Sequence, residues 1–118
     1  MRRVRWMFAA ALACAALATS CRTLPPSKPL SELTAEEAAG HEIYQARCAR
    51  CHHPNSTRGL NGPGLQALYK QPYMPSGAPA NDERIRAVIV HGRNMMPASA
   101  NGLDEQQLAN LMAYLHTL

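Results

Sequence analysis

The chain has 118 residues, a formal net charge of +4 and only 5% aromatic residues. This length holds one folded domain at most. Three of the arginines lie within the first five residues, so residues 22–118 contain nine Lys or Arg against eight Asp or Glu, a formal balance of +1. With no basic run and no aromatic platform in that part, nucleic acid is not expected as a partner.

The N-terminus predicts an export signal. The basic stretch MRRVR precedes an apolar run over residues 6–18, which is shorter than the roughly 20 apolar residues that span a bilayer. Residues 1–20 are therefore predicted to be a signal peptide. Ala16 and Ala18, small residues on either side of Leu17, suit a cleavage that releases a soluble product. In contrast, LATSC, ending at Cys21, resembles a bacterial lipobox whose cysteine becomes the lipidated N-terminus. Both routes lead to the periplasmic side of a Gram-negative bacterium, and the second anchors the protein to a membrane.

A proline-rich tether is expected to follow. Residues 22–33 carry three prolines and no periodic apolar pattern, which is typical of a semi-rigid spacer. The folded domain is predicted to extend over residues 34–118.

The domain is predicted to be all-α, with about four helices and long loops. Thr34 and Glu37 form a capping box for a helix that runs to about Cys48. A short helix is expected within residues 65–70, and a third over residues 82–92, after the cap Asn81.

A second capping box precedes the last helix. Asp104 and Gln107 form this box, and the leucines that follow recur at helical spacing to the C-terminus. A domain of 85 residues without Trp or Phe has little material for a core, and domains of this size often need a staple or a cofactor.

The stretch CARCH, from Cys48 to His52, predicts what fills that core. A disulfide oxidoreductase would place such a cysteine pair after a strand, and none is expected. Adjacent ligands crowd a zinc tetrahedron, and a disulfide would close only a tiny loop. C-x-x-C-H is the attachment motif for haem c: Cys48 and Cys51 form thioethers with the haem vinyl groups, and His52 reaches the iron.

Residues 34–118 resemble a class I c-type cytochrome, which carries a single haem. Gly40 and Tyr44 stand where this family keeps a glycine and an aromatic residue before the first cysteine, and LMAYL near the C-terminus matches the family's helix-packing pattern. GPGL at residues 62–65 matches a family motif in which, by resemblance, the carbonyl of Pro63 accepts a hydrogen bond from Nδ1 of His52.

The resemblance also implies the second axial ligand of the iron. The family uses a methionine just before a proline, in the loop that precedes the last helix, and Met96 fits both conditions. Met95 is adjacent but does not precede a proline directly. Met74 precedes Pro75, yet it comes before the third helix rather than after it. His91 would give bis-histidine ligation but is expected at the surface.

The function that the resemblance implies is electron transfer rather than enzymatic catalysis. The partners would be redox proteins, such as a dehydrogenase, an oxidase or another cytochrome, with membrane contact only through the lipid anchor. Two alternatives stay open. One is a haem-based ligand binder or sensor with a labile sixth site, and the other is a redox subunit of a larger dehydrogenase or oxidase complex.

Overall fold

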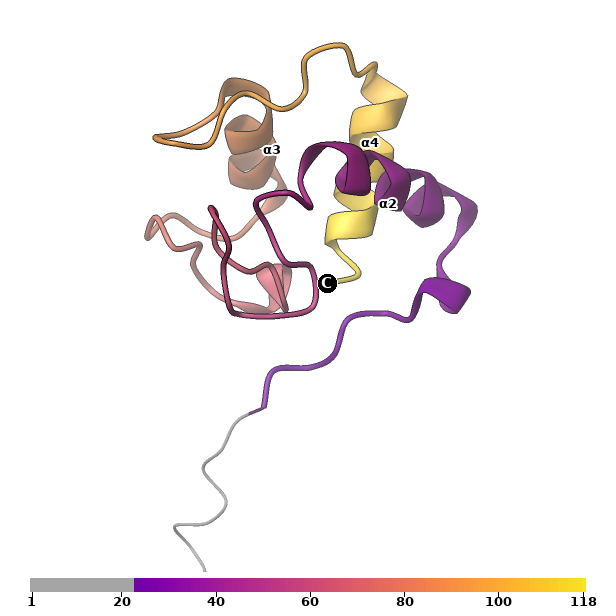
Figure 1. Cartoon of the computed structure of the whole chain (residues 1–118), viewed down its shortest axis with the longest axis horizontal. Helices are drawn as coiled ribbons and strands as arrows, with labels where there is room; N and C mark the ends of the chain where they lie inside the picture. The colour runs from indigo at the N-terminus through magenta and orange to yellow at the C-terminus, as the bar shows by residue number, and fades with distance from the viewer. Residues whose placement is uncertain (1–22) are drawn as a thin grey trace, which may run out of the picture.

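The computed structural model describes residues 23–118, and the fold is all-α, as predicted. The predicted signal peptide and the predicted lipidation site, Cys21, lie outside the described residues. Among residues 23–118 there are three α-helices, two short 3-10 helices and no strand (Figure 1). The elements are η1 (Leu30–Glu32), α2 (Ala35–Arg47), η2 (Leu68–Lys70), α3 (Asp82–His91) and α4 (Glu105–Leu115).

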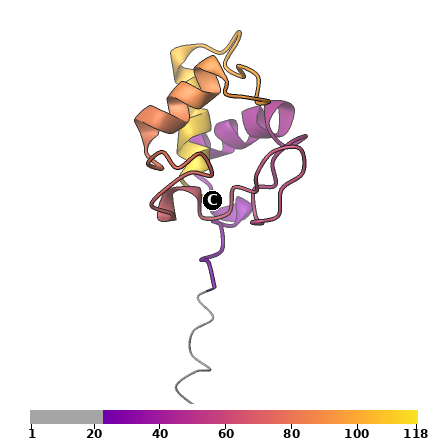
Figure 2. The ribbon, with the colours of Figure 1, turned by 90° about the vertical axis from the view of Figure 1, so that its left-hand side faces the viewer.

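The first and last α-helices cross at close range, as Figures 1 and 2 show. The crossing is possible because Gly40 of α2 has no side chain: a Cβ there would overlap the main chain of Asn110 in α4. One turn further along α2, Tyr44 is fully buried, and its ring centroid lies 5.2 Å from that of Tyr114 in α4. The crossing therefore fixes where α2 ends, just before the cysteine motif.

The helix boundaries follow the caps that the sequence predicts. Both capping boxes are present, at Thr34 with Glu37 and at Asp104 with Gln107. The side chain of Asn81 accepts a hydrogen bond from the N–H of Arg84 at 3.0 Å and begins α3. Each cap satisfies main-chain N–H groups that have no partner inside the helix.

The short helix predicted within residues 65–70 is only partly formed. The structure has the single 3-10 turn η2 in its place, preceded by Ala67 with a φ of 57°. This left-handed conformation is unfavourable inside a right-handed helix. A regular helix therefore cannot continue through Ala67, and the predicted fourth helix is reduced to one turn.

The proline-rich segment lies against the domain over most of its described length. The N–H of Lys28 donates to the carbonyl of Thr117 at 2.8 Å, and its ammonium pairs with Glu37 at 2.6 Å. Gln66 donates to the carbonyl of Pro25 at 3.4 Å. The part of the tether after Pro25 thus follows the domain surface, and its role as a spacer stays a prediction.

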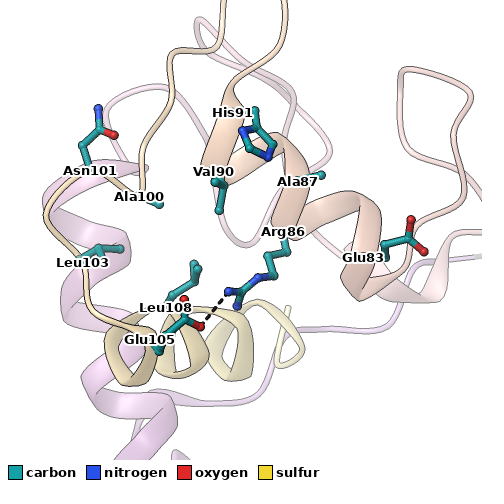
Figure 3. Close-up of a pocket in the computed structure, with 10 residues that line it drawn as sticks. All are labelled: Glu83, Arg86, Ala87, Val90, His91, Ala100, Asn101, Leu103, Glu105 and Leu108. Atoms are coloured by element: carbon teal, nitrogen blue, oxygen red, sulfur yellow. Dashed lines mark hydrogen bonds and ion pairs between the residues drawn. The ribbon is translucent and has the colours of Figure 1, made fainter.

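The third helix, α3, stands beside α4 and is linked to it by an ion pair. Arg86 of α3 and Glu105 of α4 approach to 2.8 Å (Figure 3). Ile85 and Ile89 lie on the buried side of α3 and join one core cluster with residues of α2 and α4. Within residues 23–118, no helix is both long enough and apolar enough to cross a membrane.

Candidate functional site

A cleft of about 430 Å³ opens between the cysteine motif, α3 and the loop that follows α3. Its walls are mostly apolar, and they include the predicted site residues Cys48, Cys51, His52, Pro63 and Met96. Further apolar lining comes from Leu65, Leu68, Met74, Ile85, Val88, Ile89 and Leu115. Such a lining suits a large apolar group that keeps water out.

The two cysteines lie on a single turn at the end of α2. Cys48 caps the helix, and its carbonyl accepts hydrogen bonds from the N–H groups of Cys51 at 3.0 Å and His52 at 2.9 Å. The turn brings both thiols and the imidazole to one wall of the cleft. The thiols are not joined in a disulfide, and burial raises the pKa of Cys48 to about 11, which keeps a free thiol neutral at pH 7.

His52 is held by hydrogen bonds on two sides. Its Nδ1 lies 2.7 Å from the carbonyl oxygen of Pro63, and its own carbonyl accepts a hydrogen bond from the buried hydroxyl of Tyr44 at 2.7 Å. Because a carbonyl oxygen can only accept, Nδ1 must carry the proton in this contact. The lone pair of Nε2 is then available to a metal, which is the usual way in which a hydrogen bond prepares a histidine ligand.

Gly62 leaves room for the His52 ring. A Cβ at position 62 would lie 2.9 Å from both Nδ1 and Nε2, and closer still to Cε1. The N–H of Gly62 donates to the carbonyl of Cys51 at 2.8 Å. The GPGL segment therefore packs its main chain directly against the histidine that it orients.

Met96 differs from two of the other candidates for the second axial position, Met95 and His91, in its burial and in its place at the cleft. Met96 is partly buried, packs against the core and lines the cleft, whereas Met95 is 91% exposed. A short loop fixes Met96, because its N–H and carbonyl each pair with the main chain of Arg93 at 2.9 Å. Met74 is likewise partly buried, packs against the core and lines the cleft, so its place before α3 in the sequence is what distinguishes it from Met96. His91 is exposed and borders a different groove.

The zinc alternative receives no support from the side-chain arrangement. Among residues 23–118, no group of three or more His, Cys, Asp or Glu side chains is placed to hold a metal ion. The residues of the cleft instead suit haem c: two thiols and one imidazole lie on one wall, a thioether belongs to the lining, and the remaining surface is mostly apolar. This donor set is one that binds covalent haem.

Sequence reasoning missed the arginines at the cleft. Arg47, Arg50 and Arg93 all belong to its lining and are exposed. Arg47 and Arg50 could have been found from their positions beside the cysteines, but nothing in the sequence shows where their side chains go. Arg93 follows Gly92, which has a φ of 74°, and its main chain pairs with that of Met96.

Comparison with known proteins gives consistent matches. The model of a protein family described as "Cytochrome C oxidase, cbb3-type, subunit III" matches residues 25–115. The chain is 27% identical over 84 residues to a cytochrome c6 of Picosynechococcus sp., which covers 69% of this chain and 72% of that protein. It is 30% identical over 83 residues to a cytochrome c6 of Nostoc sp., covering 70% and 71%. It is 31% identical over 85 residues to cytochrome c-551 of Bacillus subtilis, covering 72% and 64%.

Replacing Gly62 with alanine tests how closely the main chain at this position packs against the His52 ring. Because the new Cβ would overlap the imidazole ring, we expect Gly62→Ala to lower the free energy of unfolding by about 1–3 kcal/mol, as overpacking does. The same overlap should alter the absorption spectrum of the protein matured in a host that attaches haem c. Chemical unfolding and absorption spectroscopy measure the two effects.

Leu60→Ala, at an exposed position in the same loop, serves as the control and should change neither the stability nor the spectrum. Wild-type stability and spectrum in Gly62→Ala would show that the ring is not tightly packed there.

Proposed function

Since the chain belongs to this family of monohaem c-type cytochromes, we propose that it carries single electrons on the periplasmic side of a bacterial membrane, with His52 and Met96 as the axial ligands of its haem iron. Electron transfer by one covalently attached haem c, without enzymatic turnover, is the activity of the family. The ligands, the compartment and the partners are the proposed part. The observation that carries the proposal is that His52 and Met96 line one apolar cleft together with Cys48 and Cys51.

Bound haem supplies a ferrous–ferric couple that takes up and releases one electron. The chain's own residues set the conditions for that exchange. The carbonyl of Pro63 holds Nδ1 of His52 at 2.7 Å, which fixes the ring and makes Nε2 a better donor. Met96 would hold the iron through its thioether, and such a ligand would raise the reduction potential and close the site to small molecules. The apolar lining excludes water.

Charge around the cleft supports an electron path through its mouth. The residues that line the cleft include Arg47, Arg50 and Arg93 and no Asp or Glu. Arg50 and Arg93 are exposed at this cleft. The near-neutral total charge of residues 22–118 therefore hides an uneven distribution, with a positive face where a redox partner would meet the haem edge. Transient redox complexes usually have small interfaces, and complementary charge speeds their formation.

The location of the protein is proposed from its N-terminal sequence. Residues 1–20 have the pattern of a signal peptide, and Cys21 ends a lipobox-like stretch. If Cys21 is lipidated, the segment from residue 22 to Pro25 is short, and the domain would stay near the membrane surface. The proposed partners, a dehydrogenase, an oxidase or another cytochrome, would then be reached along that surface.

A second candidate is a redox subunit of a larger oxidase. The description of the matching family favours it, because that description names an oxidase subunit. The electron-transfer chemistry is the same in both candidates. They differ only in whether the complex with the redox partner is stable or transient. Stable co-purification with an oxidase from native membranes would favour the subunit, and recovery as a free protein would favour the carrier.

Ligand binding to the reduced protein separates a carrier from a haem-based sensor. With Met96 in place, we expect no response of the reduced spectrum to carbon monoxide, and a weak far-red band of methionine-bound iron in the oxidised spectrum. Met96→Ala should abolish that band, admit carbon monoxide and lower the reduction potential by on the order of 100 mV, within the roughly 0.8 V that axial ligands span. Met95→Ala, at a 91% exposed neighbour, should match the wild type. Ready carbon monoxide binding by the wild type would favour the sensor.

Oxidation of the reduced protein by ferricyanide tests the positive face. Neutralising an arginine at the mouth should slow reaction with this anion, so we expect Arg50→Gln and Arg93→Gln each to lower the rate constant roughly twofold at low salt. The difference should shrink as salt screens the charges. Stopped-flow kinetics measures the rates. Arg84→Gln, an exposed arginine of α3 outside the cleft lining, carries the same charge change. If all three variants react alike, electrons do not leave through this mouth.

A further inference from the structure

Arg47 joins two distant parts of the chain through its side chain. It is the last residue of α2 and directly precedes Cys48. Its Nη1 donates to the carbonyl of Ser99 at 3.1 Å and to the carbonyl of Asn101 at 2.8 Å. Both acceptors belong to the loop that carries Met96. One guanidinium thus links the helix end that precedes the first cysteine to the loop on the other wall of the cleft.

Ser99 is held from both sides. Its N–H donates to the carbonyl of Ile89 in α3 at 2.8 Å, while Arg47 binds its carbonyl. Within the described part of the chain, no other side chain from outside the loop forms a hydrogen bond with residues 93–103. The hydrogen-bonded link between this loop and α2 therefore depends on one side chain, that of Arg47. It reaches the loop at Ser99, which is three residues after Met96.

The other side of this loop is only partly packed: Ala100 and Leu103 are half-buried against the core. An open groove of about 450 Å³ separates the loop from α3 and the start of α4. Figure 3 shows Ala100 and Leu103 pointing into this groove, towards Val90 and Leu108, while Asn101 points away from it. A loop that is only partly packed opens more easily than a fully packed one. Its position over the cleft thus depends on the hydrogen bonds of Ser99 and Asn101 together with this partial packing.

We propose that Arg47 is a positioning residue that holds the Met96 loop closed over the cleft. Hydrogen bonds from a charged donor are stronger than those between neutral groups, and here they act on the main chain, so they restrain the loop without touching the iron. The consequence for ligand exchange rests on the proposed role of Met96: while Arg47 is bound, the thioether cannot swing away far enough to admit a competing ligand.

The test uses the complete haem-loaded protein and two independent measurements. In Arg47→Gln, amide hydrogen exchange of residues 93–103, followed by mass spectrometry, should become about tenfold faster, since a hydrogen bond from a charged group contributes at least about this factor. Imidazole should bind the oxidised protein about tenfold more tightly. Arg47→Lys, which keeps a charged donor but not the planar fork, should lie between wild type and Arg47→Gln. Arg58→Gln, an exposed arginine outside the cleft lining, should leave both measurements unchanged.

The two measurements distinguish the possible failures. If exchange in residues 93–103 is the same in wild type, Arg47→Gln and Arg58→Gln, Arg47 does not hold the loop and the inference is wrong. If exchange rises in Arg47→Gln while the wild-type spectrum shows no methionine ligation, the inference stands and the proposed ligand Met96 fails. Faster exchange with tighter imidazole binding in Arg47→Gln supports both.

Discussion

The close crossing of α2 and α4 at Gly40 positions the end of α2 and the cysteine motif that follows it. Without a side chain at this point, the two helices approach until the main chain of Asn110 occupies the space of the missing Cβ. Tyr44 and Tyr114 pack beside the contact, and the Tyr44 hydroxyl reaches the carbonyl of His52 at 2.7 Å. The C-terminal helix, although far away in sequence, thereby sets the direction in which α2 delivers the cysteine motif.

The two walls of the cleft are held in different ways. On the side of Cys48, Cys51 and His52, main-chain hydrogen bonds and the Pro63 carbonyl define a tight turn. On the side of Met96, a loop between α3 and α4 packs partly against the core and borders an open groove. One wall is a hydrogen-bonded turn that holds the cysteines proposed for haem attachment, while the other is a loop that a single side chain, that of Arg47, links to α2. This asymmetry explains why a single arginine can matter at a site where it is not a ligand.

Much of this arrangement could be predicted from the sequence, because it depends on local chemistry. The caps at Thr34, Asn81 and Asp104 act within one helical turn, and they were correct. The spacing of the cysteine motif, C-x-x-C-H, by itself indicates haem attachment. The fourth helix is shorter than predicted, since the left-handed residue is Ala67, whose side chain gives no hint of that conformation. The contacts of Arg47 with carbonyl oxygens more than 50 residues away leave no sequence signal either, because any residue offers a carbonyl.

The central claim is that His52 and Met96 bind one iron from opposite walls of the same cleft. X-ray absorption at the iron edge tests it most directly, using the purified haem-loaded protein in both oxidation states. The account predicts a single sulfur scatterer among nitrogen ligands, present in the oxidised and the reduced protein alike and lost in Met96→Ala. A first shell without sulfur in the wild type, or a sulfur that persists in Met96→Ala, would contradict it.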